Sequence, residues 1–330
     1  TLGGGVLLLI GVVWLHTIAG PIDFQERGVL SGLSHLDPWT LRWIFLFMII
    51  GLGVKAALFP LHGWLPQAMV APAPVSALLH AVAVVKAGAF GIIRVVYDVF
   101  GVEYADALGL LPFLGAIAAF TIVYGSVKAL SQDHLKRRLA YSTISQVSYI
   151  ALGTAILGPL ATIGGIVHLV HQGVMKITLF FAAGNYAETL GIHHVSEMDG
   201  VGRRMPATTL AFSIAALGMI GIPPIAGFIS KWYLGLGALQ AGAGLWVIPV
   251  LIASSLLNAA YFLPILYRAW FKPAVVNWPA EKPQSGRWEL PGALMWPPVI
   301  TAILALAFGL FAGAAFSPLE WATLIATREY

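Results

Sequence analysis

Nine long apolar stretches, separated by short turns that carry Gly or Pro, make up most of this 330-residue chain. A helix of about 20 mostly apolar residues crosses the roughly 30 Å hydrocarbon core of a bilayer. Charged residues are only 10% of the chain, whereas soluble domains contain about 25%. We therefore expect an all-α, polytopic membrane helix bundle with about nine transmembrane helices, at residues 2–20, 40–59, 74–98, 108–130, 139–157, 160–184, 207–239, 243–271 and 292–315.

The composition excludes several classes of site. The sequence has no Cys, which rules out disulfide frameworks, thiolate metal sites and cysteine nucleophiles. No basic stripe supports a nucleic-acid partner. The chain begins at Thr1 and enters an apolar run at once, without a start Met or a secretory signal. We expect it to be part of a longer chain, N-terminally truncated.

Basic residues outside the spans gather on one side of the predicted bundle. The opposite side has Arg27 and Arg328, with Arg42 and Arg94 near span ends. The positive-inside rule assigns the more basic side to the cytoplasm, so we expect a multi-pass protein of the bacterial cytoplasmic (inner) membrane, in contact with the lipid bilayer. Nine basic residues lie on that side: Lys136, Arg137, Arg138, Arg203, Arg204, Arg268, Lys272, Lys282 and Arg287.

Prolines interrupt two of the predicted spans. Pro60 and Pro66, with His62 between them, follow the second span, and Pro223 and Pro224 cut the seventh. Such breaks persist in a membrane only where protein or a wet cavity supplies partners for the freed backbone groups. Their separation indicates an inverted-repeat transporter architecture. We expect three parts: the C-terminal part of a first repeat at 1–107, a second repeat at 108–271, and a loop plus a final transmembrane helix at 272–330.

Four lysines, Lys55, Lys86, Lys176 and Lys231, remain inside apolar spans. Insertion scales assign about 2.5 to 3.5 kcal/mol to a lysine near the bilayer centre, so the four together would cost roughly 10 to 14 kcal/mol. The alternative is that some of them reach an interface or pair with carbonyls at the helix breaks. We favour a functional role, because the cost is comparable with the whole stability of many domains.

Histidines accompany these lysines. His168, Gln172 and Lys176 are four residues apart in turn, so they form one polar stripe, about 12 Å long, on a helix. His168 and His171 could together hold haem or a metal, but no carboxylate or Cys joins them in that span, and we expect no metal and no cofactor.

The remaining histidines near the lysines are His80 and His62. His80 is six residues before Lys86, which places the two on different faces of a regular helix, although they could still face two ends of one water chain. His62 lies in the first break, where capping of freed backbone is as good an explanation as transport.

All fourteen acidic residues lie in loops or near span ends. Loss of hydration favours the neutral form of a buried amine, whereas a carboxylate at about 4 Å favours the charged form by about 4 kcal/mol at an effective dielectric of 20. Amines in this setting can take up and release protons as a partner charge approaches or leaves. We expect an acidic partner of this kind before Thr1 or in another subunit.

Several motifs in a fixed order give the chain a family resemblance. It resembles the proton-conducting antiporter-like membrane subunits shared by respiratory complex I (NADH:quinone oxidoreductase), Mrp-type cation/proton antiporters and membrane-bound hydrogenases. The motifs are KAALFPLHGWLPQAMVAPAPVSALLHAVAVVKAGAFGIIR (55–94), KRRLAYSTISQVSYI (136–150), HLVHQGVMKITLFFAAG (168–184), MDGVGRRMP (198–206), GMIGIPPIAGFISKW (218–232) and SSLLNAAYFLPILYRAWF (254–271).

The resemblance implies two inverted half-channels, one in each antiporter repeat, joined by a lysine relay. Lys55 matches the lysine of the first broken helix, and the family's acidic partner for it lies on an earlier helix. Lys231 matches the terminal lysine of the second broken helix. Between them, His80 and Lys86 match the central relay, and His168 and Lys176 match the link between the two halves. Gln172 departs from the family pattern, because many relatives have a second histidine there and this chain has His171 beside it instead; we include both in the expected relay.

These features leave three functional hypotheses. The first is a proton-translocating subunit of a multi-subunit complex of the NADH:quinone oxidoreductase, Mrp antiporter or group 4 hydrogenase type, with other membrane subunits as partners and no catalytic centre in this chain. The second is a sodium/proton antiporter subunit of an Mrp-type assembly or, in a related form, a membrane partner in inorganic-carbon uptake. The third is a non-transporting scaffold, or a haem protein that uses His168 and His171.

Overall fold

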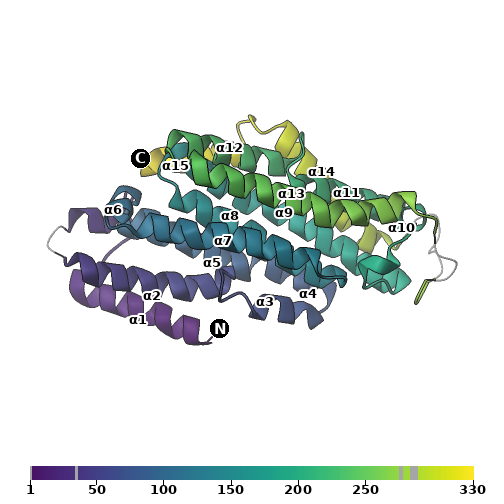
Figure 1. Cartoon of the computed structure of the whole chain (residues 1–330), viewed down its shortest axis with the longest axis horizontal. Helices are drawn as coiled ribbons and strands as arrows, with labels where there is room; N and C mark the ends of the chain where they lie inside the picture. The colour runs from purple at the N-terminus through teal and green to yellow at the C-terminus, as the bar shows by residue number, and fades with distance from the viewer. Residues whose placement is uncertain (1, 34–35, 275–277, 283–288) are drawn as a thin grey trace.

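The computed structural model describes residues 2–33, 36–274, 278–282 and 289–330, which form a bundle of helices that run along one common direction (Figure 1). Arg287 and part of the predicted loop after residue 272 lie outside the described residues. The elements, in chain order, are α1 (Leu2–Ala19), η1 (Val29–Gly32), α2 (Pro38–Ala56), α3 (Trp64–Gln67), η2 (Ala68–Val70), α4 (Ala73–Ala77), η3 (Leu78–Val82), α5 (Val84–Arg94), η4 (Val95–Phe100), α6 (Val102–Ala107), α7 (Leu110–Leu130), α8 (Leu135–Ala155), α9 (Pro159–Leu190), η5 (Val195–Glu197), α10 (Val201–Arg204), α11 (Pro206–Ile220), α12 (Ala226–Gln240), α13 (Gly244–Phe271), α14 (Gly292–Leu310) and α15 (Pro318–Glu329).

Seven helical segments in this part of the chain are long and apolar enough to cross a membrane: α1, α2, Ala73–Phe100, α7, α9, α13 and α14. The other two predicted spans are helical as well. One is α8, which begins with a cluster of basic residues, and the other is divided into α11 and α12. The structure thus confirms an all-α membrane helix bundle.

The first proline-broken segment finds its partners inside the bundle. Helix α2 ends at Ala56, and Ala57 adopts a left-handed conformation with φ 57°. The Phe59 amide donates to Thr121 Oγ1 at 3.1 Å, and the Trp64 indole donates to the Val54 carbonyl at 2.7 Å. These bonds replace part of what the interrupted helix loses, as a break within a membrane requires.

The second break separates α11 from α12. Helix α11 ends at Ile220, and Gly221 has φ 99°, which favours glycine. The chain then passes through Pro223 and Pro224 before α12 begins at Ala226. The carbonyls of Met219 and Ile220, at the end of α11, have no N–H partner within the helix. Both accept hydrogen bonds from the side chain of Lys231 instead.

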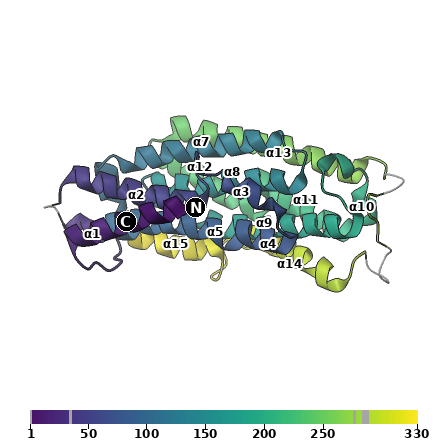
Figure 2. The ribbon, with the colours of Figure 1, turned by 90° about the horizontal axis from the view of Figure 1, so that it is seen from below.

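The last predicted span, expected at 292–315, is the single helix α14, which ends five residues earlier than expected and is long enough to cross a membrane. Helix α14 ends at Leu310, and helix α15 begins after a short turn. Both helices pack against α9, one along each half of its length (Figure 2). At one end of α9, Asn185 Nδ2 donates to the Leu294 carbonyl at 2.9 Å, and at the other the Gly158 amide donates to the Tyr330 hydroxyl at 2.8 Å. Gly313 lies in the turn between the two helices, and Ser317 and Pro318 begin α15, where the Ser317 side chain accepts from the Glu320 amide at 3.1 Å.

Candidate functional site

Helix α9 is the central element of the candidate site. It contacts α8, α11, α12, α14 and α15, as well as α4 and η3. His168, Gln172 and Lys176 are all fully buried along it, as their spacing predicts, and His171 is fully buried as well. The polar stripe therefore faces the interior of the bundle and not the lipid.

Lys176 is bound by the neighbouring helix α8. Its Nζ donates to Ser142 Oγ at 2.6 Å and to the Leu139 carbonyl at 3.2 Å. The Tyr261 hydroxyl of α13 hydrogen-bonds with the same Ser142 Oγ at 2.8 Å. Three helices thus meet at the Lys176 amine, and all of these side chains are fully buried.

A second set of contacts continues from Tyr261 to the second break. The Tyr261 hydroxyl contacts Asn258 Oδ1, one turn earlier on α13, and Asn258 Nδ2 donates to the Met219 carbonyl at 3.2 Å. Lys231 Nζ donates to that same carbonyl at 3.0 Å and to the Ile220 carbonyl at 2.8 Å. Hydrogen bonds therefore connect Lys176 with Lys231 through the protein alone.

Lys231 also contacts groups on two other helices. Its Nζ donates to Ser255 Oγ of α13 at 3.0 Å and lies 5.5 Å from the centre of the Tyr149 ring. The same Tyr149 ring lies 5.2 Å from the ring of His168, whose Nδ1 is 2.7 Å from Ser230 Oγ, the residue before Lys231. His168 and Lys231 are thus neighbours, although 63 positions separate them in the sequence.

Lys86 and His80 both contact α9, which differs from the expectation for a regular helix. Lys86 Nζ donates to the Leu169 carbonyl, and the His80 ring lies 4.8 Å from the Phe180 ring. The reason is the π-helical turn η3, which changes the angular relation between the two residues. Their contacts are 11 residues apart on α9, about 16 Å along its axis.

Some buried polar side chains have no protein partner among the described residues. They include both ring nitrogens of His80 and both polar atoms of Gln146 and of Gln172. Buried polar groups in proteins are nearly always paired with protein or with ordered water. His80, Gln146 and Gln172 therefore offer hydrogen-bond donors and acceptors that other described residues do not use.

Lys55 is placed apart from these groups. It lies in the last turn of α2 with an exposed side chain, directly before the first break. His62, in that break, is buried against aromatic rings, 5.7 Å from Phe59 and 4.9 Å from Tyr124 between ring centres. The structure brings together the other three lysines and the histidines of α9, but not Lys55.

Carboxylates in the described part of the chain lie at the ends of the bundle. Asp98 is buried, but its ion pair is with Arg94 at 2.8 Å, and buried Glu329 accepts from the Arg27 amide at 3.1 Å. Neither contacts the buried amines, in agreement with the sequence-based expectation.

The uncharged members of this network were not among the residues predicted from the sequence. Ser142 and Gln146 lie one turn apart on α8, and Ser254, Asn258 and Tyr261 follow a helical spacing on α13, where Ser254 lies 3.4 Å from the Ser126 hydroxyl of α7. Polar residues repeated at i, i+4 and i+7 within an apolar helix indicate a buried polar face. This spacing is present in the sequence and could have identified these residues.

Fold and site together define a class: a polytopic membrane protein whose interior holds amines connected by hydroxyl, amide and carbonyl groups. Residues 1–257 match the profile of the family described as "NADH:quinone oxidoreductase/Mrp antiporter, TM". The chain belongs to this family and is an integral membrane protein.

Individual comparisons agree with this assignment. The chain is 40% identical over 315 residues to NADH-quinone oxidoreductase subunit N of Desulforudis audaxviator, covering 92% of this chain but 61% of that relative. Its fold is similar to a chain of respiratory complex I from Thermus thermophilus, with a TM-score of 0.80 and 26% identity, covering all of this chain and 67% of the other. It is also similar in fold to a chain of the Mrp complex from Dietzia sp., with a TM-score of 0.85 and 24% identity over 99% of this chain and 66% of the other.

Proposed function

We propose that this chain is the proton-conducting part of a membrane subunit in a multi-subunit complex, in the bacterial cytoplasmic membrane. The observation that carries the proposal is the buried connection from Lys176 through Ser142, Tyr261 and Asn258 to the carbonyl that Lys231 contacts. The hydroxyl groups of Ser142 and Tyr261 both donate and accept hydrogen bonds, so they can pass a proton to or from Lys176. Asn258 and the Met219 carbonyl hold Tyr261 and Lys231 at one place, and water would carry the proton between these two residues.

The roles of the residues follow from their places. His80, Lys86, His168, His171, Gln172 and Lys176 form the relay along α9, and water completes it where His80 and Gln172 have no protein partner. Lys231 is the terminal amine at the second break. Lys55 is the terminal amine at the first break, and its acidic partner belongs to a preceding segment or to another subunit.

The repeat organisation fits the same proposal. The broken α2–α3 segment belongs to the C-terminal part of a first antiporter repeat at 1–107, and the broken α11–α12 segment to a second repeat at 108–271. Residues 272–330 provide a loop and the final crossing. Electron transfer would take place in other subunits, because the polar groups brought together here are proton donors and acceptors.

Lys176→Ala tests this function in the full-length subunit assembled with its partners. We expect proton translocation per electron to fall strongly, because the only amine that contacts Ser142 in the described structure is removed. Lys128→Ala is the matched control, since the Lys128 side chain is exposed and its ammonium group lies 5.9 Å from the centre of the Tyr124 ring, outside the network. Unchanged translocation in the Lys176 variant would reject the relay.

The alternative function is sodium/proton exchange in an Mrp-type assembly, which the family description and the fold of the Dietzia complex favour. The two functions differ in what drives proton movement. In vesicles containing the assembled complex, a sodium gradient alone would drive proton movement in an antiporter. In a redox-driven complex, proton movement would require electron transfer and would not depend on sodium.

A further inference from the structure

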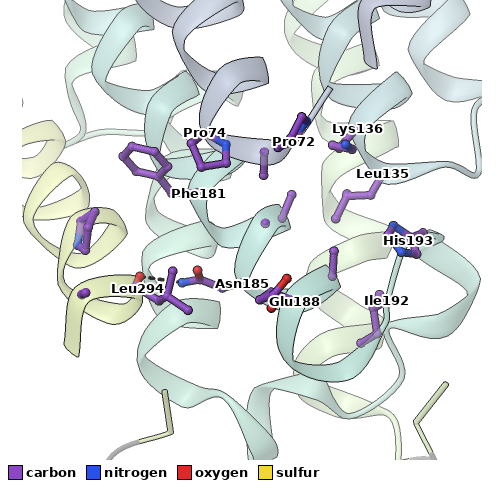
Figure 3. A pocket seen from close by; sticks show the side chains of 16 residues that line it. Pro72, Pro74, Leu135, Lys136, Phe181, Asn185, Glu188, Ile192, His193 and Leu294 are labelled. Atoms are coloured by element: carbon purple, nitrogen blue, oxygen red, sulfur yellow. Dashed lines mark hydrogen bonds between the residues drawn. The ribbon is translucent and has the colours of Figure 1, made fainter. Parts of the chain in front are cut away.

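A cavity of about 550 Å³ opens at the basic end of the bundle, away from the amine network. Its walls come from the start of α4, the start of α8, the last three turns of α9 with the turn that follows, and the start of α14 (Figure 3). Four segments that are distant in the sequence therefore share one cavity, and α14 closes one side of it.

The lining of this cavity is apolar on one side and mixed on the other. Phe181 and Leu294 lie on the apolar side, to which Pro297 also contributes, whereas Lys136 and His193 lie on the other side together with Leu135 and Ile192 (Figure 3). A ligand that fits both sides must be amphiphilic, with an apolar chain and a polar group at one end.

The charges of the cavity favour an anion. Lys136 Nζ donates to the Ala71 carbonyl at 2.8 Å, which leaves two of its three N–H groups for a ligand. In the described part of the chain Lys136 has no carboxylate partner, because Glu188, which also lines the cavity, forms an ion pair with Lys282. The cavity thus keeps one uncompensated positive charge, and the His193 ring adds a hydrogen-bonding group beside it.

The position of the cavity matches that of a lipid headgroup. Lys136, Arg137 and Arg138 begin α8 at the end of the bundle where the basic residues gather, which is the level at which anionic headgroups of the cytoplasmic leaflet attract Lys and Arg. The apolar side lies along α9 and α14, both of which are candidate membrane spans.

We propose that this cavity binds one anionic phospholipid of the phosphatidylglycerol type, with its phosphate at Lys136 and His193 and the start of an acyl chain against Phe181, Leu294 and Pro297. The bound lipid would connect α4, α8, α9 and α14 at this end of the bundle. This site is separate from the proposed proton path and does not depend on it.

The test is a lipid titration of the full-length, delipidated protein in detergent, with the bound lipid counted by native mass spectrometry. Phosphatidylglycerol is compared with phosphatidylcholine of the same acyl chains. We expect one tightly bound phosphatidylglycerol, weakened roughly fivefold by Lys136→Gln, because one surface Lys contributes about that factor toward anionic lipid. Arg137→Gln is the matched control, since it removes the same charge from the next residue, which does not line the cavity.

A second variant tests the apolar part independently. Ala293→Trp, at the exposed start of α14, places a ring in the cavity and is expected to abolish the tight binding. Glycerol phosphate, which has the headgroup but no chain, should not displace the lipid at equal concentration. The proposal is overturned if phosphatidylcholine binds equally well, if Lys136→Gln and Arg137→Gln weaken binding by the same factor, or if glycerol phosphate displaces the lipid.

Discussion

The amines of Lys176 and Lys231 are held by hydroxyls and backbone carbonyls, and in the described residues neither has a carboxylate partner. A fixed buried ion pair would hold an amine in its charged form, and its removal would leave an uncompensated charge. Neutral oxygen acceptors do not impose a charge in this way. An amine with such partners remains able to exchange its proton, which is what a relay requires.

Tyr261→Phe is the sharpest test at the residue scale, because it removes one hydroxyl and keeps the ring. The link between Ser142 and Asn258 would be lost, so we expect the proton translocation rate to fall by about tenfold or more. Stability should fall by about 1 to 3 kcal/mol, because buried Ser142 and Asn258 both lose a hydrogen-bond partner. The rate is measured with a pH-sensitive dye in proteoliposomes of the full complex.

Tyr267→Phe is the matched control for that experiment, since Tyr267 lies on the same helix with an exposed ring. It should leave both translocation and stability unchanged. Equal translocation in the two variants would mean that protons do not pass through the Tyr261 hydroxyl.

At the scale of elements, the close approach of α14 to the second break depends on one glycine. A Cβ at Gly309 would lie 1.9 Å from the Pro224 carbonyl oxygen, which is far inside van der Waals contact. Phe308, the preceding residue, stacks on the ring of His171 at 6.0 Å. The end of α14 therefore packs at the same level as the break in α11–α12 and beside the α9 histidines.

Gly309→Ala should force α14 away from this break. We expect a loss of stability of about 1 to 3 kcal/mol, as for other overpacked core positions, together with slower proton translocation because His171 loses its neighbour. Thermal unfolding in detergent measures the first effect and proteoliposome assays the second. Gly313→Ala is the control, because a Cβ there would meet nothing within 4 Å; similar results for both variants would contradict the proposed packing.

For the whole molecule, the asymmetry of basic residues predicts an orientation in the membrane, with the basic end on the cytoplasmic side. The sequence has no Cys, so a single introduced cysteine is a unique label in this part of the protein. Arg203→Cys lies at the basic end and Asp106→Cys at the opposite end, and both positions are exposed. We expect a membrane-impermeant maleimide to label only Asp106→Cys in intact cells.

Inverted membrane vesicles reverse the accessible side, so Arg203→Cys should then be the reactive variant. Labelling of both variants from one side would contradict the orientation and the number of crossings between them. Labelling of Arg203→Cys alone in intact cells would reverse the assignment of the cytoplasmic side.

The sequence by itself determined the class of fold and much of the site. The length and apolarity of the stretches require helices in a bilayer, because every backbone group there must be paired internally. The prolines at 60, 66, 223 and 224 located both breaks, and the spacing of His168, Gln172 and Lys176 placed them on one buried face. These are local properties, and the helical period of 3.6 residues is enough to derive them.

Only the tertiary structure decided which helices bring their polar faces together. Lys176 meets Ser142 and Tyr261, from helices that precede and follow it by more than 30 positions, because close packing sets the neighbours of each helix. The π turn η3 and the helix α15 that follows the last crossing also became visible only in the structure, where both pack against α9. The sequence of one helix does not specify which other helices pack against it. Periodicity therefore identified the polar face of each helix, and only the packing of the helices showed which polar faces are in contact.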